Sequence, residues 1–558
     1  MKGKARLLVG VAGAALLISG AAWAQTETTT TTTTLTKHHR HHRVTKTKTK
    51  ITATTSGSVT GSMAAAPAEA ASSAESNPSL EERVRRLEEQ IEADQDREQA
   101  EHTRLTTLEQ NFGDTSWSFD NARPTVKSGD GRFTMAIRVR FQADEVNFFQ
   151  DVPNDTPTHV VQFKDLSSGA MVRRAFFGVE GKAFNDFWYE LRYNAGGGGN
   201  SETDPALSLA RIAYLGLPNF ELNAGVIEPA FMFEGTTSSG QLMFMERPEI
   251  DNIAADSFGA GDGRRGIEAR YQKADMFMPG DNFVIGGDFT GGKTASAVGH
   301  GNGGDEQTQL MLHGDYRVWS DGISNISFGG DYSRAFTGGK GNGGGVITLQ
   351  DRPEFRVDGD RLISTGSLVA KTASMWGAHA GANFENFYVG GEYAHFSVDR
   401  DNVLVAGTPG YLADNPEFSG WYLEGSWVIT GEPKSYTVSA TNNEVGGFGA
   451  PKVASPFSFS GDSWGAWELT ARYSSTDLNW NENRIAIAPT PTDPGIQAGV
   501  AGGEERILMV GVNWYLNNNV KLQLNDGIVH VGKLAAPGSV VQVGQNLNIL
   551  GMRLQFTN

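Results

Sequence analysis

The stretch FTMAIRVRFQAD, Phe133–Asp144, decides the fold of this chain, because its apolar and polar residues alternate at every position from Phe133 to Gln142 except Ala136. Successive side chains of a strand point to opposite faces, so one face of this segment is apolar and the other is polar and carries guanidinium groups. The apolar face carries Phe133, Met135, Ile137, Val139 and Phe141, and the polar face carries Thr134, Arg138, Arg140 and Gln142. In a soluble sandwich the apolar face would point to a core, whereas in a membrane barrel it would point to lipid and the polar face would line water.

Fifteen similar alternating runs follow, which makes sixteen predicted strands with boundaries uncertain by a few residues. The further runs are 170–182, 187–194, 207–216, 220–227, 266–272, 282–290, 308–318, 323–334, 368–384, 387–398, 419–429, 466–474, 506–515, 520–530 and 548–556.

The connections between these runs alternate between short and long. Short joins such as 184–186, 218–219 and 517–519 are rich in Asn, Asp, Gly and Pro, the residues that tight turns require. An even number of antiparallel strands with short turns at one end and long loops at the other is typical of outer-membrane barrels. The pattern favours a barrel over a soluble β-sandwich and puts both chain ends in the periplasm. One join, 430–465, is long where a short turn is due.

Composition limits the alternatives. Cysteine is absent, so thiol chemistry, disulfides and thiolate metal sites are excluded, and the net charge of −17 argues against a nucleic-acid partner. After the N-terminus no apolar run approaches the roughly 20 residues that a membrane helix needs. No nucleophile–base arrangement emerges and the histidines of the ordered segments lack metal-ligand spacing, so we expect no enzyme activity, no cofactor and no metal site. The letters GDFTGGKT, 287–294, match a phosphate-binding loop, but no helix follows them to hold phosphate.

The N-terminal 131 residues divide by composition into four segments. Residues 1–24 read as a signal peptide, with a basic start, an apolar core and Ala22-Trp23-Ala24 as the cleavage site. Residues 25–77 are a disordered Thr/His/Ala-rich tether. Residues 78–113 carry apolar residues at heptad spacing, which predicts a periplasmic coiled-coil helix that oligomerises, with a lone surface helix as the alternative. Residues 114–131 are a linker, and the barrel domain is 132–558.

The connection 228–265 is the longest between two alternating runs, and we call it the constriction loop because a loop of this length can fold into the barrel and narrow it. Its predicted site residues are Glu228, Pro229, Glu246, Arg247, Arg264 and Arg265. The loop is rich in carboxylates, which would favour cations or neutral solutes if they face the opening.

Alternation places basic side chains on the predicted inner face. The predicted pore-lining residues are Arg138, Arg140, Arg174, Arg192, Arg270, Arg472, Arg553 and Lys521. Carboxylates share this face, and most of the arginines are expected to pair with them. Arginine suits phosphate because its planar fork donates two hydrogen bonds to an oxyanion.

Five stretches in order resemble the phosphate-selective porin family, porins O and P. They are Arg173 to Gly181, Glu228 to Arg247, Trp427 to Glu432, Gly465 to Tyr473 and Gly511 to Asn517. The resemblance implies a trimeric barrel of sixteen strands and also accounts for the long join 430–465. It departs from the family at Ile227, where a Lys usually precedes Glu-Pro, and at Thr557-Asn558, where an aromatic end is common.

We therefore expect an all-β transmembrane barrel that lies in the lipids of the bacterial outer membrane and forms a homotrimer. Small solutes or inorganic anions are expected to cross it by diffusion. Phosphate selectivity competes with a general or cation-preferring pore. The alternative function is a structural protein whose N-terminal coiled coil contacts the cell wall.

Overall fold

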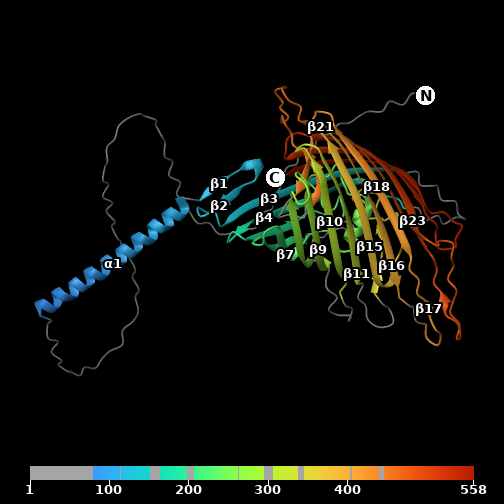
Figure 1. The fold of residues 1–558 in the computed structure, drawn as a ribbon, viewed down its shortest axis with the longest axis horizontal. Helices are drawn as coiled ribbons and strands as arrows, with labels where there is room; N and C mark the ends of the chain where they lie inside the picture. Colours follow the sequence, from blue (N-terminus) through green and yellow to red (C-terminus); the bar gives the residue numbers. More distant parts are fainter. Residues whose placement is uncertain are drawn as a thin grey trace, which may run out of the picture. The chain divides into compact units, whose positions relative to one another are not determined.

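The computed structural model describes residues 79–113, 115–150, 164–197, 206–261, 263–293, 306–336, 345–401, 405–438 and 445–558. The expected signal peptide (1–24) and tether (25–77) lie outside the described residues. The barrel domain is a closed antiparallel barrel of sixteen strands (Figure 1). The strands are β3 (Thr134–Gln150), β4 (Gly169–Ala183), β5 (Phe187–Asn194), β6 (Ala206–Tyr214), β7 (Phe220–Ile227), β8 (Arg264–Ala274), β9 (Asn282–Lys293), β10 (Thr308–Ser320), β11 (Asn325–Phe336), β15 (Leu368–Phe384), β16 (Phe387–Arg400), β18 (Glu417–Val428), β21 (Ala466–Trp480), β23 (Val500–Tyr515), β24 (Val520–Gly532) and β25 (Asn546–Thr557).

Each barrel strand pairs with its neighbours in sequence, and the last strand pairs with the first. β25 lies antiparallel to β3 in a register that sets Leu554 opposite Ala143 and Leu550 opposite Asn147. This seam leaves no open barrel edge, which is what a membrane-spanning sheet requires because lipid cannot hydrogen-bond to exposed backbone.

All sixteen predicted strands are confirmed. Three of them, β5, β7 and β15, have the predicted bounds, and the largest shifts are six residues, at the end of β3, the end of β21 and the start of β23. The sequence GDFTGGKT lies in and just after β9 (Asn282–Lys293), so up to Lys293 it forms a strand and not a phosphate-binding loop.

Burial alternates along the strands as the sequence pattern predicts. In β25, Leu550, Met552 and Leu554 are exposed, whereas Arg553 and Gln555 are buried. An apolar face that is exposed over the whole wall is stable only against an apolar medium such as lipid, because removing each CH₂ group from water contributes about 0.8 kcal/mol of free energy. Aromatic rings stack beside the short turns, with Phe387 on Trp427 and Trp467 on Trp514, as at a lipid–water interface.

The N-terminal segment contains a helix and a small hairpin. Helix α1 (Leu80–Gly113) begins at Ser79, whose Oγ accepts a hydrogen bond from the Glu82 N–H. Its apolar residues Leu80, Val84, Leu87, Ile91 and Leu105 are all exposed. The expected linker holds β1 (Ser116–Ser118), a short 3₁₀ turn at Asp120–Ala122 and β2 (Thr125–Lys127), which pairs with β3. Among the described residues, no helix has the length and apolar character to cross a membrane.

The remaining elements belong to the connections. They are α2 (Glu249–Ser257), β12 (Gly345–Ile347), β13 (Gln350–Asp351), β14 (Ile363–Ser364), β17 (Tyr411–Leu412), β19 (Lys434–Val438), β20 (Val445–Pro451) and β22 (Gly495–Ile496). The hairpin β19–β20 occupies the join 430–465, which the short–long pattern did not explain.

Candidate functional site

The constriction loop enters the barrel, as expected. Its residues 228–263 connect β7 to β8 and include α2, and most of their side chains are buried. On one side of the lumen the loop backbone bonds to strands β24 and β25. Lys521 Nζ donates to the Leu242 carbonyl at 2.8 Å, and the Asn525 amide oxygen accepts from the Met245 N–H at 2.9 Å. These bonds fix the loop against this side of the barrel wall.

On the opposite side the loop bonds to carboxylates of β11 and β16. The N–H of Met232 donates to Asp331 Oδ1 at 3.0 Å, and the N–H of Phe233 donates to Glu392 Oε1 at 3.1 Å. Met232 has a φ of +65°, a conformation that L residues rarely adopt and that these bonds help to hold. The loop thus spans the lumen and is held at both walls.

Apolar side chains of the loop form a core inside the barrel. The buried apolar residues of the loop in this core are Phe231, Met232, Phe233, Met243, Phe244, Met245, Ile250, Ile253, Ala254, Phe258 and Ala260. The Arg472 guanidinium carbon lies 4.4 Å from the centre of the Phe244 ring, a cation–π contact between wall and loop. Alternation could not predict this core, because an infolded loop has no period.

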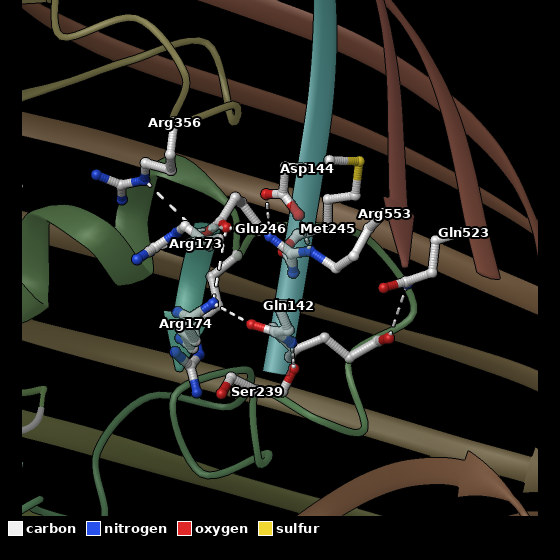
Figure 2. Close-up of polar contacts among 12 residues, drawn as sticks. Gln142, Asp144, Arg173, Arg174, Ser239, Met245, Glu246, Arg356, Gln523 and Arg553 are labelled. Atoms are coloured by element: carbon white, nitrogen blue, oxygen red, sulfur yellow. Dashed lines mark hydrogen bonds and ion pairs between the residues drawn. The ribbon is translucent and has the colours of Figure 1, made fainter. Parts of the chain in front are cut away.

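Glu246 is the centre of the strongest charge cluster (Figure 2). Arg173 binds it in bidentate geometry at 2.8 and 3.0 Å, and Arg553 Nη2 donates to it at 2.6 Å. Arg174 lies at 3.7 Å and Arg356 at 3.9 Å. Burial by itself raises the pKa of the Glu246 carboxyl, but the guanidinium groups of Arg173, Arg174 and Arg553 outweigh it and hold the pKa well below its usual range. Glu246 is therefore an anion enclosed by arginines and does not present a negative charge to solutes.

Arg553 joins this cluster to the barrel seam. Its Nε and Nη2 donate to the two oxygens of Asp144 on β3, both at 2.7 Å, and the side chain is fully buried. Figure 2 shows Arg553 between Asp144 and Glu246. The same guanidinium thus ties together the first strand, the last strand and the constriction loop.

The other predicted pore-lining arginines contact carboxylates or hydroxyls. Arg138 lies 2.8 Å from Glu180 and Arg192 lies 2.6 Å from Glu228. Further contacts join Arg270 to Glu221 and Glu268, Arg472 to Glu354, and Arg140 to the Ser238 and Ser239 hydroxyls. Most of the predicted basic wall is therefore used in holding the loop and neutralising carboxylates.

The predicted constriction-loop residues have different surroundings. Arg247 donates to the backbone carbonyls of Glu234 and Thr237, at 2.8 and 2.7 Å, and so braces the loop itself. Pro229 is buried. Arg264 and Arg265 belong to β8, where Arg264 is buried and donates to the Ala255 carbonyl. Arg265 lies on the exposed face and pairs with Glu306, away from the contacts that hold the loop.

Two carboxylates of α2 lack cationic partners of this kind. Burial raises the pKa of Glu249 well above its usual range, and the carboxylate of Glu505 beside it adds to the effect. Burial also raises the pKa of Asp251, reinforced by Glu234. These shifts favour the neutral form of both carboxyls, so the loop is less acidic than its composition indicates.

Two further connections also enter the lumen, and the sequence analysis missed both. In β19–β20, Lys434 Nζ lies 2.8 Å from Glu468, the Tyr436 hydroxyl donates to Asp315 at 2.6 Å, and the Phe448 ring packs against Phe233. In the connection that holds β13 and β14, Glu354 pairs with Arg472, and Arg356 reaches Glu246. The unexpected length of the join 430–465 was the only sequence signal for the hairpin.

A cavity of about 400 Å³ lies between the constriction loop, the hairpin and the short turn 517–519. We call it the basic chamber, because Arg138, Arg140, Lys452 and Lys521 line it and, within the described part of the chain, no Asp or Glu is among its lining residues. Arg138 shares its charge with Glu180, whereas Lys521 donates to a neutral carbonyl. Lys452 also lines a second cavity of about 520 Å³ together with Arg317 and Lys434.

The sequence matches a known family over most of the barrel. The family described as phosphate-selective porin O and P matches residues 140–557. Porin O of Pseudomonas aeruginosa is 21% identical over 420 residues, which cover 71% of this chain and 83% of that protein.

Solved outer-membrane proteins are also similar. The anion-selective porin from Comamonas acidovorans is 11% identical with a TM-score of 0.44, covering 76% of this chain and 100% of that one. OmpT of Vibrio cholerae is 9% identical with a TM-score of 0.41, covering 76% and 98%. The channel DcaP of Acinetobacter baumannii is 11% identical with a TM-score of 0.39, covering 77% and 99%.

Proposed function

The chain belongs to the family of phosphate-selective porins O and P and is therefore an outer-membrane diffusion porin, and we propose that its basic chamber makes small anions the preferred solutes. Solutes cross down their gradient, filtered by the size of the opening beside the constriction loop and by the charges that face it. No energy source and no chemical step is part of this mechanism.

The absence of acidic residues from the lining of the basic chamber carries this proposal. The acidic composition of the loop would argue for cations, but Glu228 and Glu246 are ion-paired and burial raises the pKa of Glu249 and of Asp251, which favours their neutral forms. The charges left facing solvent beside the loop are then those of the chamber. Selectivity follows the few charges at the narrowest part of a pore rather than the net charge of −17.

The chamber also favours oxyanions over halides. The Arg140 guanidinium already donates to the Ser238 and Ser239 hydroxyls, and the Gln241 and Asn518 side chains that line the same cavity can donate hydrogen bonds to several oxygens at once. Lys452, which is exposed, supplies a compact charge at the same cavity. Inorganic phosphate is the oxyanion that we propose as the preferred solute.

Planar-bilayer recordings in a KCl gradient test the proposal, with inorganic phosphate added as a blocker of the chloride current. We expect an anion-side reversal potential, and a chloride conductance that falls as phosphate is added. Lys452→Gln should weaken phosphate block about fivefold, since one unit charge at 4 Å in water is worth about 1 kcal/mol. Lys273→Gln, which removes an exposed lysine outside the chamber, is the matched control. A cation-side reversal potential in the wild type would refute the proposal.

We also propose a homotrimer whose short turns and N-terminal helix face the periplasm. The exposed apolar stripe of α1 supports a partner helix for it, and a second copy of α1 in the same assembly would supply one. The alternative of a structural role for this helix predicts loss of envelope integrity with intact conductance when residues 25–112 are deleted.

A further inference from the structure

A second polar cluster lies inside the barrel on four adjacent strands. It comprises His313 and Asp315 on β10, Asp331 on β11, His379 on β15 and Glu392 on β16, each with 5% or less of its surface exposed. The strand register brings them together, because His313 stands opposite Asp331 and His379 stands opposite Glu392. The residues are far apart in sequence, so no ligand spacing revealed them.

Three atoms of this cluster have the arrangement of a metal site. His379 Nδ1 lies 3.3 Å from Asp331 Oδ2 and 3.8 Å from Glu392 Oε1, and the ligand atoms of the three residues lie within 4.8 Å of one another. Ligands held about 2.0–2.1 Å from a tetrahedral Zn²⁺ are separated by roughly 3.3 Å. A small contraction of the three side chains therefore encloses a cation.

Two of the atoms that would bind the cation make no hydrogen bond. His379 Nδ1 and Asp331 Oδ2 are both buried and lie 3.3 Å apart, and neither meets hydrogen-bond geometry with any group. The other ring nitrogen, Nε2, lies 3.4 Å from Asp315 Oδ2, and Asp315 also accepts from the Tyr436 hydroxyl. A carboxylate behind the second nitrogen is the usual support of a metal-binding histidine, because it directs the lone pair of the first nitrogen toward the ion.

The charge balance points the same way. Asp315, Asp331 and Glu392 are three buried carboxylates, and their ion-pair partners within the described part of the barrel are two imidazoles and no lysine or arginine. Arg317, which is on β10 like Asp315, stacks over the Tyr436 ring. Burying a charge costs several kcal/mol, and a divalent cation would offset two of the three negative charges.

From this geometry we propose that Asp331, His379 and Glu392 bind a divalent transition-metal ion of the Zn²⁺ class. One imidazole and two carboxylates form a mixed nitrogen–oxygen set, which suits Zn²⁺ or Co²⁺ and supplies too few oxygens for Ca²⁺. The site is structural, since the three residues are buried on the wall beneath the loop.

The ion would fix the position of the constriction loop. The same two carboxylates accept the Met232 and Phe233 N–H groups, and the Phe233 ring stacks on the His379 ring with centroids 4.8 Å apart. Drawing Asp331 and Glu392 toward one ion therefore holds the loop segment 232–233 against the wall. The metal is thus expected to stabilise the folded barrel and to reduce fluctuations of the pore current.

Metal analysis of full-length protein tests the inference. The wild type is unfolded in denaturant with EDTA, refolded into detergent with Zn²⁺, dialysed, and assayed by plasma mass spectrometry and thermal unfolding. We expect the wild type to retain about one Zn²⁺ per chain more than Glu392→Gln or Asp331→Asn, and to unfold at a higher temperature with Zn²⁺ than without it. Histidines 38, 39, 41 and 42 occur in every variant, so the difference between variants counts only this site.

His395→Gln is the matched control, because His395 is a partly exposed histidine of the same strand as Glu392. It should keep the metal. Where a variant does not refold, Co²⁺ loaded into the wild type gives a second measurement, with visible absorption bands of a tetrahedral nitrogen–oxygen site expected. Equal metal in the wild type and in Glu392→Gln, or a Co²⁺ spectrum of the hexahydrate alone, would overturn the inference.

Discussion

Replacing Glu246 by Gln removes the negative charge that four arginines share where they meet the constriction loop. Arg173, Arg174, Arg356 and Arg553 all lie within 4.0 Å of this carboxylate. The substitution keeps the size of the side chain, so the effect is electrostatic. Truncating one partner of a buried ion pair costs about 3–5 kcal/mol, because the remaining charges stay buried. Asp144 still compensates Arg553, which places Glu246→Gln near the lower end of this range.

Two assays measure the consequence. Thermal unfolding in detergent should occur about 3 °C lower, since each residue contributes roughly 2.1 cal/mol/K to the entropy of unfolding and the barrel domain has about 430 residues. In a KCl gradient the selectivity should shift toward anions, by up to about fivefold for one unit charge at 4 Å in water. Glu385→Gln, in an exposed short turn, is the control. If Glu246→Gln unfolds at the wild-type temperature and has the wild-type reversal potential, the arginines do not depend on this carboxylate and the reasoning is refuted.

Three further changes have defined outcomes. The pKa of Glu249 is raised well above its usual range in the folded protein, whereas in the unfolded chain this group ionises above about pH 4.3. The free energy of unfolding should therefore fall as the pH rises from there toward the raised pKa. Glu249→Gln should flatten this decline in pH-dependent melting curves. Arg247→Met removes two hydrogen bonds to loop carbonyls, so single-channel recordings should show more current noise and melting should be lower by the equivalent of about 2–3 kcal/mol, whereas a large change of selectivity with unchanged noise would contradict the bracing role. Lys434→Met leaves Glu468 buried without its cation, and we expect about 3 kcal/mol of destabilisation together with a larger conductance as the hairpin loosens, which melting and bilayer recordings would check against Lys273→Gln.

The barrel wall could be predicted from sequence because a strand in a barrel has one rule. Every second residue faces lipid, so the alternation that begins at Phe133 recurs in all sixteen strands and specifies which side chains point inward. The turns add independent information, since Asn, Asp, Gly and Pro end the runs. The constriction loop was also recognisable, because a connection of this length between two regular strands can fold into the barrel and narrow it.

The interior could not be predicted to the same depth. The contacts of Glu246 come from β4, β25 and the connection before β15, so they depend on how three segments meet in the lumen. A sequence shows that arginine and carboxylate share a face, but not which pairs form. The polar cluster of His313, Asp331, His379 and Glu392 has the same origin, because cross-strand register rather than local spacing assembles it.

The hairpin β19–β20 shows a second limit of sequence patterns. Its length was evident, but its direction was not, since a long connection at the short-turn end can extend outward or turn inward. Tyr436 and Phe448 show the reason for the inward course. The Tyr436 hydroxyl donates to Asp315, and the Phe448 ring packs against Phe233 of the constriction loop.

The position of Arg553 has a consequence for how the barrel is assembled. This residue belongs to the last strand, yet it donates to Asp144 of the first strand and to Glu246 of the constriction loop. Its guanidinium therefore has its full set of partners only when the first and last barrel strands are paired and the constriction loop is in place. Closure of the barrel and placement of the constriction loop are therefore coupled through this side chain. A barrel that closed without the loop in place would leave Arg553 buried at the seam without Glu246.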